Sequence, residues 1–214
     1  MSMSLDIPSR VAALTHVGAA WILWLLIGLS IIALSIILER LYVLVLARGD
    51  ADVCRRDLAA MLRRGDLGGA RVRAQASRSI EARVIAAGLD SAAPAPAAAG
   101  ERLAGARELA KLELERRLAF LGTLGNNAPF IGLLGTGIGI IRAFRTLDGA
   151  VGGKVSAGLM TEVGEALVAT AIGILVALPA IAAFNAFQRI IKTRLARVDA
   201  LGRELVAALS AGRP

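Results

Sequence analysis

The feature that most limits how this chain can fold is a set of three long stretches without a charged side chain. They run from Val17 to Leu38, from Leu118 to Ile141 and from Ala166 to Gln188. Each is at least as long as the roughly 20 residues that an α-helix needs to cross the hydrocarbon core of a bilayer. The sequence therefore predicts an all-α integral membrane protein with three transmembrane helices.

The composition agrees with helices that pack closely in lipid. Of the residues, 56% are hydrophobic but only 4% are aromatic, and 23 are glycines. Small side chains let membrane helices approach each other, whereas the core of a soluble domain needs more large ones. The net charge of +8 is spread along the chain without aromatic partners for bases. No nucleic acid partner is therefore expected.

Basic residues indicate the orientation in the membrane. Only Arg10 precedes the first apolar run, whereas six arginines follow it between positions 40 and 64, and four basic residues follow the third run. The positive-inside rule then predicts that the N-terminus lies outside, whereas the long middle segment and the C-terminus lie on the cytoplasmic side. Three basic residues in the second connection oppose this orientation: Arg142, Arg145 and Lys154.

The first apolar run is expected to be retained as an anchor. Its apolar stretch is too long for a signal peptide, and Glu39 and Arg40 follow it directly, where a cleavage site would need small residues. The expected segments are a periplasmic segment 1–16, a transmembrane helix 17–46, a cytoplasmic helical insertion 47–117, a transmembrane helix 118–147, a periplasmic connection 148–162, a transmembrane helix 163–188 and a cytoplasmic helix 189–214.

The cytoplasmic insertion has its own helical pattern. Apolar and charged residues alternate at helical spacing over 51–64, and Gly65, Gly68 and Gly69 are expected to end that helix. A second helical stretch covers 72–89, and the Pro/Ala-rich segment 91–100 is expected to be a linker. From Glu101 onward the pattern is helical without interruption, which predicts one long helix that continues into the second span.

Small residues recur at helical spacing in the second and third spans. Such positions line one face of a helix and allow a second helix to approach closely. Pro129 and Pro179 each remove a backbone hydrogen bond, which is compatible either with tolerated kinks or with a functional hinge. The residues predicted to pack helices are Gly132, Gly135, Gly139, Ala143, Gly173 and Ala177.

The polar side chains of these spans are the candidate functional residues. Thr136 and Thr170 either bond back to their own helix or belong to a water chain inside a bundle. Glu165 is either a solvated interfacial carboxylate or part of a functional path. The adjacent amides Asn126 and Asn127 cannot both face lipid at low cost, so at least one is expected to face a bundle or a wet cavity.

Catalytic and metal chemistry find little support in the sequence. The chain has one cysteine, Cys54, and one histidine, His16, which allow neither an internal disulfide nor a metal-ligand cluster. Cys54 is interpreted as a reduced cytosolic thiol. Because the spans contain no Ser–His pair, HExxH motif or paired acids, neither an enzyme nor a cofactor is expected. Internally repeated halves, typical of transporters, are not evident.

Two segments resemble a known family of membrane proteins. The string Asn127-Ala-Pro-Phe-Ile-Gly-Leu-Leu-Gly-Thr136-Gly-Ile-Gly-Ile-Ile141 resembles the second-span signature of the MotA/TolQ/ExbB proton channel family. Glu165-Ala-Leu-Val-Ala-Thr170-Ala-Ile-Gly, followed by Ala177-Leu-Pro179-Ala and Phe184-Asn185, resembles its third-span signature. The first span, from Ser30 to Glu39-Arg40-Leu41, also looks like the family. With three spans, the chain is closer to the ExbB/TolQ branch than to MotA, which has four.

The resemblance implies a homopentamer around a central pore that is lined by the second and third spans. It also implies a single-span partner of the ExbD/TolR type, whose helix enters the pore and carries a proton-accepting Asp. The pore-lining residues of the family fall on Thr136, Thr170 and Glu165, while Asn126 and Asn127 depart from the pattern of many relatives. Because no span has an acid at mid-membrane depth, the titrating acid is expected to come from the second protein.

The function that this resemblance implies is that of a proton-channel, stator-type subunit. Such a subunit couples proton flow to work on the cell envelope, in TonB-dependent transport, Tol-type maintenance or gliding motility, together with a TonB-like or motility effector. A membrane scaffold that holds a partner protein without conducting protons is the alternative.

Overall fold

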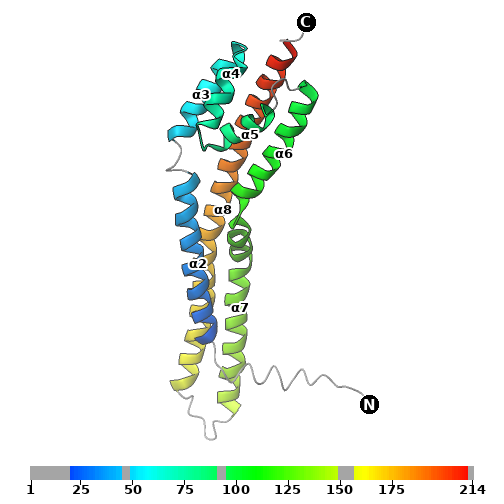
Figure 1. Ribbon diagram of the computed structural model, residues 1–214. Helices are drawn as coiled ribbons and strands as arrows, with labels where there is room; N and C mark the ends of the chain where they lie inside the picture. Colours follow the sequence, from blue (N-terminus) through cyan, green and yellow to red (C-terminus); the bar gives the residue numbers. More distant parts are fainter. Residues whose placement is uncertain (1–19, 45–48, 91–94, 149–156, 212–214) are drawn as a thin grey trace, which may run out of the picture. The chain divides into compact units, whose positions relative to one another are not determined.

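The computed structural model describes residues 20–44, 49–90, 95–148 and 157–211, and all its regular structure is α-helical (Figure 1). The predicted segment 1–16, His16 and Lys154 lie outside these residues. The helices are α2 (Ala20–Leu44), α3 (Gly49–Arg63), α4 (Leu67–Gln75), α5 (Ile80–Gly88), α6 (Pro96–Glu115), α7 (Leu118–Asp148) and α8 (Ala157–Ala211).

Three of these helices, α2, α7 and α8, are long and apolar enough to cross a membrane. The predicted all-α class with three candidate spans is therefore confirmed for the described part of the chain. The chain divides into two compact units. Of the described residues, the apolar unit holds 20–37, 119–148 and 157–184, and the polar unit holds 38–44, 49–90, 95–118 and 185–211.

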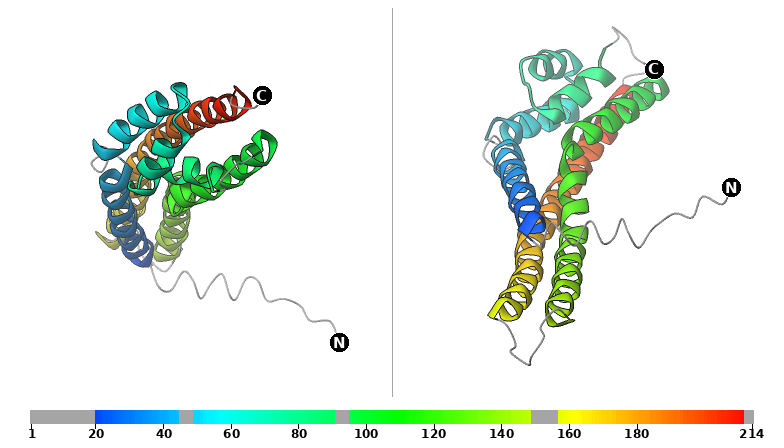
Figure 2. Two further views of the ribbon diagram at one scale, coloured as in Figure 1. Left: turned by 45° about the horizontal axis from the view of Figure 1, so that its top comes forward. Right: turned by 90° about the horizontal axis from the view of Figure 1, so that it is seen from below.

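In the apolar unit, α7 and α8 run antiparallel and touch through their backbones. A Cβ atom on Gly132 would lie 2.8 Å from the carbonyl oxygen of Ala169, and one on Gly173 would lie 2.7 Å from that of Ala128. Figure 1 and Figure 2 show the two helices side by side. Since real Cβ atoms do not approach a backbone oxygen so closely, any side chain at either glycine would push the helices apart.

The contact between the two helices continues on both sides of this point. Gly139 lies against Ala166, and Gly125 lies against Ile181. Ala143 and Ala177 are also buried. α2 adds a third layer, because its buried Ile22 lies against Gly135 of α7, 3.6 Å from where a Cβ atom would be. The opposite side of α2 carries exposed apolar residues, as expected of a helix that faces lipid: Trp24, Ile31, Leu34 and Leu38.

The polar unit is a separate bundle of short helices with an apolar core. α3, α4, α5, α6 and the last third of α8 contribute fully buried side chains such as Leu58, Ile85 and Leu205. Asp66 caps α4 by accepting from the Gly69 backbone N–H, and Ser79 caps α5 by accepting from that of Ala82. The free Cys54 is buried in this core and makes no disulfide.

Ion pairs join the helices of the polar unit at their surface. Arg73 of α4 donates to Asp57 of α3 at 3.0 Å. Arg197 of α8 lies 3.2 Å from Asp52 of α3, which connects segments that are 145 residues apart. Such surface pairs contribute about 0–1 kcal/mol each, so they select the register of the helices more than they stabilise the fold.

The structure differs from the sequence-based prediction in the insertion. The expected helix over 72–89 is two helices, α4 and α5, because Ser79 adopts an extended conformation and begins a new helix as its N-cap. Gly68 and Gly69 lie within α4 and do not break it, whereas Gly65, with φ +73°, follows the end of α3. The predicted linker 91–100 is shorter than expected, since Pro96 occupies the first turn of α6.

The predicted long helix from Glu101 into the second span is also wrong. α6 ends at Glu115 and α7 begins at Leu118. Between them, Arg117 has a φ of 66°, in the left-handed region that is unfavourable for residues with a side chain. Its guanidinium pairs with Glu39 at the end of α2. This ion pair accompanies a break that the local sequence, with no Gly or Pro at positions 106–118, does not signal.

We predict that the glycine contact between α7 and α8 decides the stability of the apolar unit. Gly132→Ala should destabilise the protein by about 1–3 kcal/mol, because its Cβ would meet the backbone of α8. Gly137→Ala is the matched control on the same helix, since nothing lies within 4 Å of its Cβ. Thermal unfolding of the detergent-purified variants checks this, and equal Tm values would contradict the predicted contact.

We predict that an ion pair in the polar unit responds to pH. Arg83 donates two hydrogen bonds to Glu113, which lower the pKa of that carboxyl, and the charges of Arg83 and Arg40 act in the same direction. A lowered folded-state pKa means that the stabilisation is complete above the unfolded-state value of about 4.3 and is lost as the pH falls through the folded-state value.

Glu113→Gln should therefore lower the Tm by about 1–2 °C at pH 7 and have no effect near pH 2, because the pair is half-exposed and contributes under about 1 kcal/mol. Glu101→Gln, on the same helix and without an ion pair among the described residues, is the control. The assignment fails if the two variants have the same Tm at pH 7.

Candidate functional site

Two threonine hydroxyls lie at one turn of α7. The Thr170 hydroxyl, on α8, donates to the carbonyl of Gly132 at 3.1 Å. The Thr136 hydroxyl donates to the carbonyl of Leu133 at 2.7 Å. These carbonyls belong to consecutive residues, so both hydroxyls lie at the same level of the helix pair. Thr136 thus bonds back to its own helix, whereas Thr170 bonds to the neighbouring helix, an arrangement that the sequence did not predict.

Both threonines lie on the side of the helix pair that is turned away from α2. Gly135 lies against Ile22 of α2 and against Ala169 of α8. Thr136 and Thr170 follow Gly135 and Ala169 by one residue, which is about 100° around each helix. In antiparallel helices these two rotations lead to the same side. We call this side the threonine flank.

Burial supports this assignment of the two sides. On the side of α2, Ile138 and Val176 are buried. On the threonine flank, large apolar neighbours of the two threonines are exposed in the single chain: Leu133, Ile140, Leu167 and Ile174. The flank is therefore an uncovered surface, in which Thr136 and Thr170 themselves are half-buried.

Glu165 does not join the two threonines within one chain. It precedes Thr170 by five residues, which places it about 140° away around α8. This direction leads away from the threonine flank, toward the side of the helix pair on which α2 packs. Its side chain is exposed. The structure thus brings Thr136 and Thr170 together and leaves Glu165 apart from them.

The two asparagines lie about 100° apart on α7, and both are exposed in the single chain. The Asn127 amide donates to the carbonyl of Thr123 at 2.7 Å, which satisfies one of its donors within its own helix. Pro129 and Pro179 lie inside α7 and α8, which continue as helices across them. Because the helices are antiparallel and Gly125 lies against Ile181, both prolines lie on the same side of the tight contact at Gly132 and Gly173, toward the start of α7.

One pair of residues escaped the sequence analysis. Glu162 of α8 lies 3.4 Å from Arg142 of α7, and both side chains are half-buried. The second carboxylate oxygen of Glu162 is buried without a hydrogen-bond partner. The sequence did contain a signal for this pair. Arg142 is the first charged residue after the second apolar run, and Glu162 lies one helical turn before the third. Antiparallel helices bring such ends together.

The chemistry available on the threonine flank is that of hydrogen-bond acceptance. Each hydroxyl directs its single proton at a backbone carbonyl, so each presents lone pairs to the open side. Lone pairs can accept from water or from a protonated carboxyl group, but not from a carboxylate. The apolar runs that carry the threonines contain no charged residue. Among the described residues, no cluster could hold a metal ion.

Comparison with known proteins identifies the family. The model of the MotA/TolQ/ExbB proton channel family matches residues 76–200, more than half of the chain. The chain belongs to the MotA/TolQ/ExbB proton channel family, as its span signatures predict. The matched region includes α7 and the part of α8 that carries Thr170.

Relatives come from both the ExbB and the TolQ branches. An ExbB-like biopolymer transport protein of Helicobacter pylori is 46% identical over 83 residues, which are 39% of this chain and 55% of the relative. The biopolymer transport protein ExbB of Xanthomonas campestris is 41% identical over 93 residues, which are 44% and 36% of the two chains. The Tol-Pal system protein TolQ of Pseudomonas aeruginosa is 44% identical over 87 residues, which are 41% of this chain and 36% of the relative.

The matched part of this chain thus spans about a third to a half of the length of these relatives. The predicted membership of the ExbB/TolQ branch is confirmed, and the chain is similar to both kinds of protein.

We predict that the Thr170 hydroxyl stabilises the helix pair. Thr170→Val keeps the shape of the side chain but removes the hydrogen bond to Gly132, so it should cost about 0.6–1 kcal/mol. Thr170→Ser keeps the hydroxyl and should stay within about 0.5 kcal/mol of the parent. Chemical or thermal unfolding in detergent measures both, and a Thr170→Val protein as stable as the Ser variant would contradict this role.

Proposed function

We propose that this chain is the proton-conducting subunit of an inner-membrane complex that converts the proton gradient into work on the cell envelope. In this proposal, five copies surround a central pore, and their α7 and α8 helices line it. The single observation that carries the proposal is the pair of hydroxyls on the flank away from α2. Family membership supports the same assignment.

The threonine flank has the properties that one wall of such a path needs. It is the polar part of an otherwise apolar, uncovered side of α7 and α8. Lone pairs of Thr136 and Thr170 would accept from water or from a neutral carboxyl, and would thus favour the protonated form of an acid that comes near them. α2, which packs on the other side, would face lipid.

The proton carrier itself would come from a second protein. A threonine hydroxyl does not titrate within the pH range in which proteins work, and the runs that hold Thr136 and Thr170 contain no acid. We therefore propose a partner of the ExbD/TolR type, with one membrane span that carries an Asp to the level of the two threonines. Glu165 would act elsewhere in the path, nearer its periplasmic end, because it lies apart from the threonine flank.

The proposed cycle requires a change of protonation at each step. The Asp would take a proton from the periplasmic side while the hydroxyls accept from its neutral form, and would release the proton toward the cytoplasm. Each change of charge would alter the preferred orientation of the partner helix. A proton that moves through 100 mV releases about 2.3 kcal/mol, so several protons would supply one mechanical step.

The proposed orientation follows the basic residues. The N-terminus would be periplasmic, and both the insertion and the end of α8 would be cytoplasmic helical extensions. The load would be a TonB-like or Tol-type effector, or a gliding motor, because both ExbB and TolQ proteins are similar to this chain.

Proton flux into vesicles tests the proposal. The chain would be co-purified with the proposed single-span, Asp-containing partner of the ExbD/TolR type. The complex would be reconstituted in liposomes with a pH-sensitive dye and driven by an imposed potential. Thr136→Val and Thr170→Val should each lower the flux at least tenfold with the complex still assembled, whereas Thr136→Ser and Thr170→Ser should retain most of it. Glu165→Gln should also lower the flux, without loss of assembly.

Two outcomes would overturn the proposal. Full flux in both valine variants would remove the role of the threonine flank. A stable complex of native mass that conducts no protons under any driving force would favour the alternative function. In that case the same helices form a membrane scaffold for a partner protein and enclose no proton path.

A further inference from the structure

The polar unit contains a cavity of about 310 Å³ whose lining carries charges of both signs. This volume lies at the lower end of the range of small-molecule sites, about 300–1,000 Å³. The cavity is formed by the first turn of α3, the first turn of α5 and the part of α8 that follows the third apolar run. Its charged lining residues are Asp52, Glu81, Arg189, Arg194 and Arg197.

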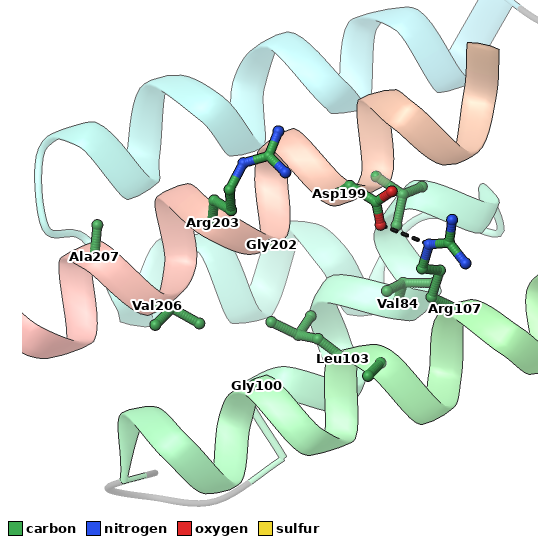
Figure 3. Close-up of a pocket in the computed structure, with 11 residues that line it drawn as sticks. Val84, Gly100, Leu103, Arg107, Asp199, Gly202, Arg203, Val206 and Ala207 are labelled. Atoms are coloured by element: carbon green, nitrogen blue, oxygen red, sulfur yellow. Dashed lines mark hydrogen bonds and ion pairs between the residues drawn. The ribbon is translucent and has the colours of Figure 1, made fainter. Parts of the chain in front are cut away.

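A larger cavity in the same unit differs from it in character. Figure 3 shows this second cavity, of about 490 Å³, beside α6 and α8. Its Arg107 donates to Asp199 at 2.6 Å, so these two charged groups satisfy each other. Among the described residues, none of the buried side-chain atoms that lack a hydrogen-bond partner belongs to its lining. Its buried polar atoms therefore require no ligand.

The smaller cavity, in contrast, contains a buried carboxyl group without a partner. Glu81 is only 3% exposed, and its Oε2 atom is buried without a hydrogen bond. Within the described part of the chain, Glu81 also makes no ion pair. A buried acceptor without a donor loses the hydrogen bonds that water would give it, and an ionised one loses more. A ligand that donates an N–H to Oε2 would restore this loss.

The basic side of the cavity is one face of α8. Arg189, Thr193 and Arg197 follow one another at intervals of four residues, so they lie on the same side of the helix. Arg197 is paired with Asp52 at 3.2 Å. Arg189 is exposed and has no ion-pair partner among the residues that the structure describes. Its guanidinium is therefore available for an anionic group.

The two signs of charge disfavour the simplest ligands. A bare anion at Arg189 would meet the carboxyl group of Glu81, whereas a metal ion or a polyamine at Glu81 would meet three arginines. A ligand that carries an ammonium group and an anion a few bonds apart is complementary to both sides. Its nitrogen must keep an N–H bond, because Oε2 of Glu81 needs a donor.

The anion that is most available to Arg189 is a phosphate. Arg189 directly follows the third apolar run of the sequence, 166–188. Basic residues at the end of a membrane span are placed to bind the phosphates of lipid headgroups. Guanidinium groups also bind phosphate oxygens through two parallel hydrogen bonds. A phosphate diester with a primary ammonium beside it fits these requirements.

We propose that the cavity binds a phosphoethanolamine group, with its ammonium at Glu81 and its phosphate at Arg189. This group is the headgroup of phosphatidylethanolamine lipids and also exists as a free solute. Binding at this site is independent of proton conduction and of the number of copies in the complex, so it stands apart from the proposed function.

Methylation of the ligand nitrogen tests the hydrogen bond to Glu81. Phosphatidylethanolamine and phosphatidylcholine with the same acyl chains share the phosphate and the net charge, but the trimethylated nitrogen of the second has no N–H. Native mass spectrometry of the detergent-purified protein, titrated with each lipid, measures the two affinities. The parent should bind phosphatidylethanolamine at least about tenfold more tightly, a difference of about 1.4 kcal/mol.

A second titration distinguishes the two sources of the group. Free phosphoethanolamine and free phosphocholine are compared by isothermal titration calorimetry on the same protein. A preference for the primary amine among the lipids identifies a lipid headgroup, and a preference only among the free compounds identifies a soluble ligand. The absence of a preference in both titrations would overturn the proposal.

Matched variants assign the preference to this cavity. Glu81→Gln should remove the preference for the primary amine. Glu204→Gln is its control and should retain the preference, because the Oε2 atom of Glu204 is also buried without a partner but Glu204 does not line the cavity. A preference that survives Glu81→Gln, or that Glu204→Gln also removes, would contradict the site.

The phosphate side is tested at an exposed residue, whose substitution leaves the buried core intact. Arg189→Gln should weaken the binding of both lipids at least about fivefold, because both carry the phosphate. Arg203→Gln, an exposed arginine of the same helix outside the cavity, should leave both affinities unchanged. Equal affinities of these two variants would exclude Arg189 from the site, even where Glu81→Gln fails to fold.

Discussion

The backbone contact between α7 and α8 is the interaction on which the rest of the apolar unit depends. At Gly132 and Gly173 the two helices are so close that neither position has room for a Cβ atom. Only this proximity lets the Thr170 side chain of one helix reach the Gly132 carbonyl of the other. In lipid, where apolar surfaces gain little by leaving their solvent, such close packing and interhelical hydrogen bonds are the main forces that hold helices together. The small residues therefore both join the helices and position the hydroxyls.

The direction of the hydroxyl protons gives this pair its chemical character. A threonine with a free proton could donate to a carboxylate, whereas Thr136 and Thr170 use theirs on backbone carbonyls of consecutive residues. What remains is a pair of acceptors on one flank of an apolar helix pair. Acceptors of this kind favour a neutral acid over its anion. The proposal that a second protein supplies the acid thus follows from hydrogen-bond geometry and from the absence of charge in the two apolar runs, as well as from family membership.

Much of this could be predicted from the sequence, because membrane spans and close helix contacts leave strong local signals. Three uncharged runs of sufficient length and glycines at helical spacing required no tertiary information. The bond from Thr170 to Gly132 could not be predicted, since it depends on how two helices are rotated against each other. Nor could the break at Arg117, where an ion pair with Glu39, remote in sequence, accompanies a backbone conformation that an arginine rarely adopts. The separation of Glu165 from Thr170 follows from their five-residue spacing, so it could have been predicted from the sequence.

The central claim is that the threonine flank faces water in the assembled complex and that α2 faces lipid. Spin labels attached at Thr136→Cys and at Ile31→Cys, an exposed position of α2, test it by their accessibility to a water-soluble nickel complex and to oxygen, which concentrates in lipid. The account predicts that the label at position 136 is relaxed more strongly by nickel and the label at position 31 more strongly by oxygen. A label at position 136 that oxygen relaxes as strongly as the one on α2 would place the threonines in lipid and contradict the account.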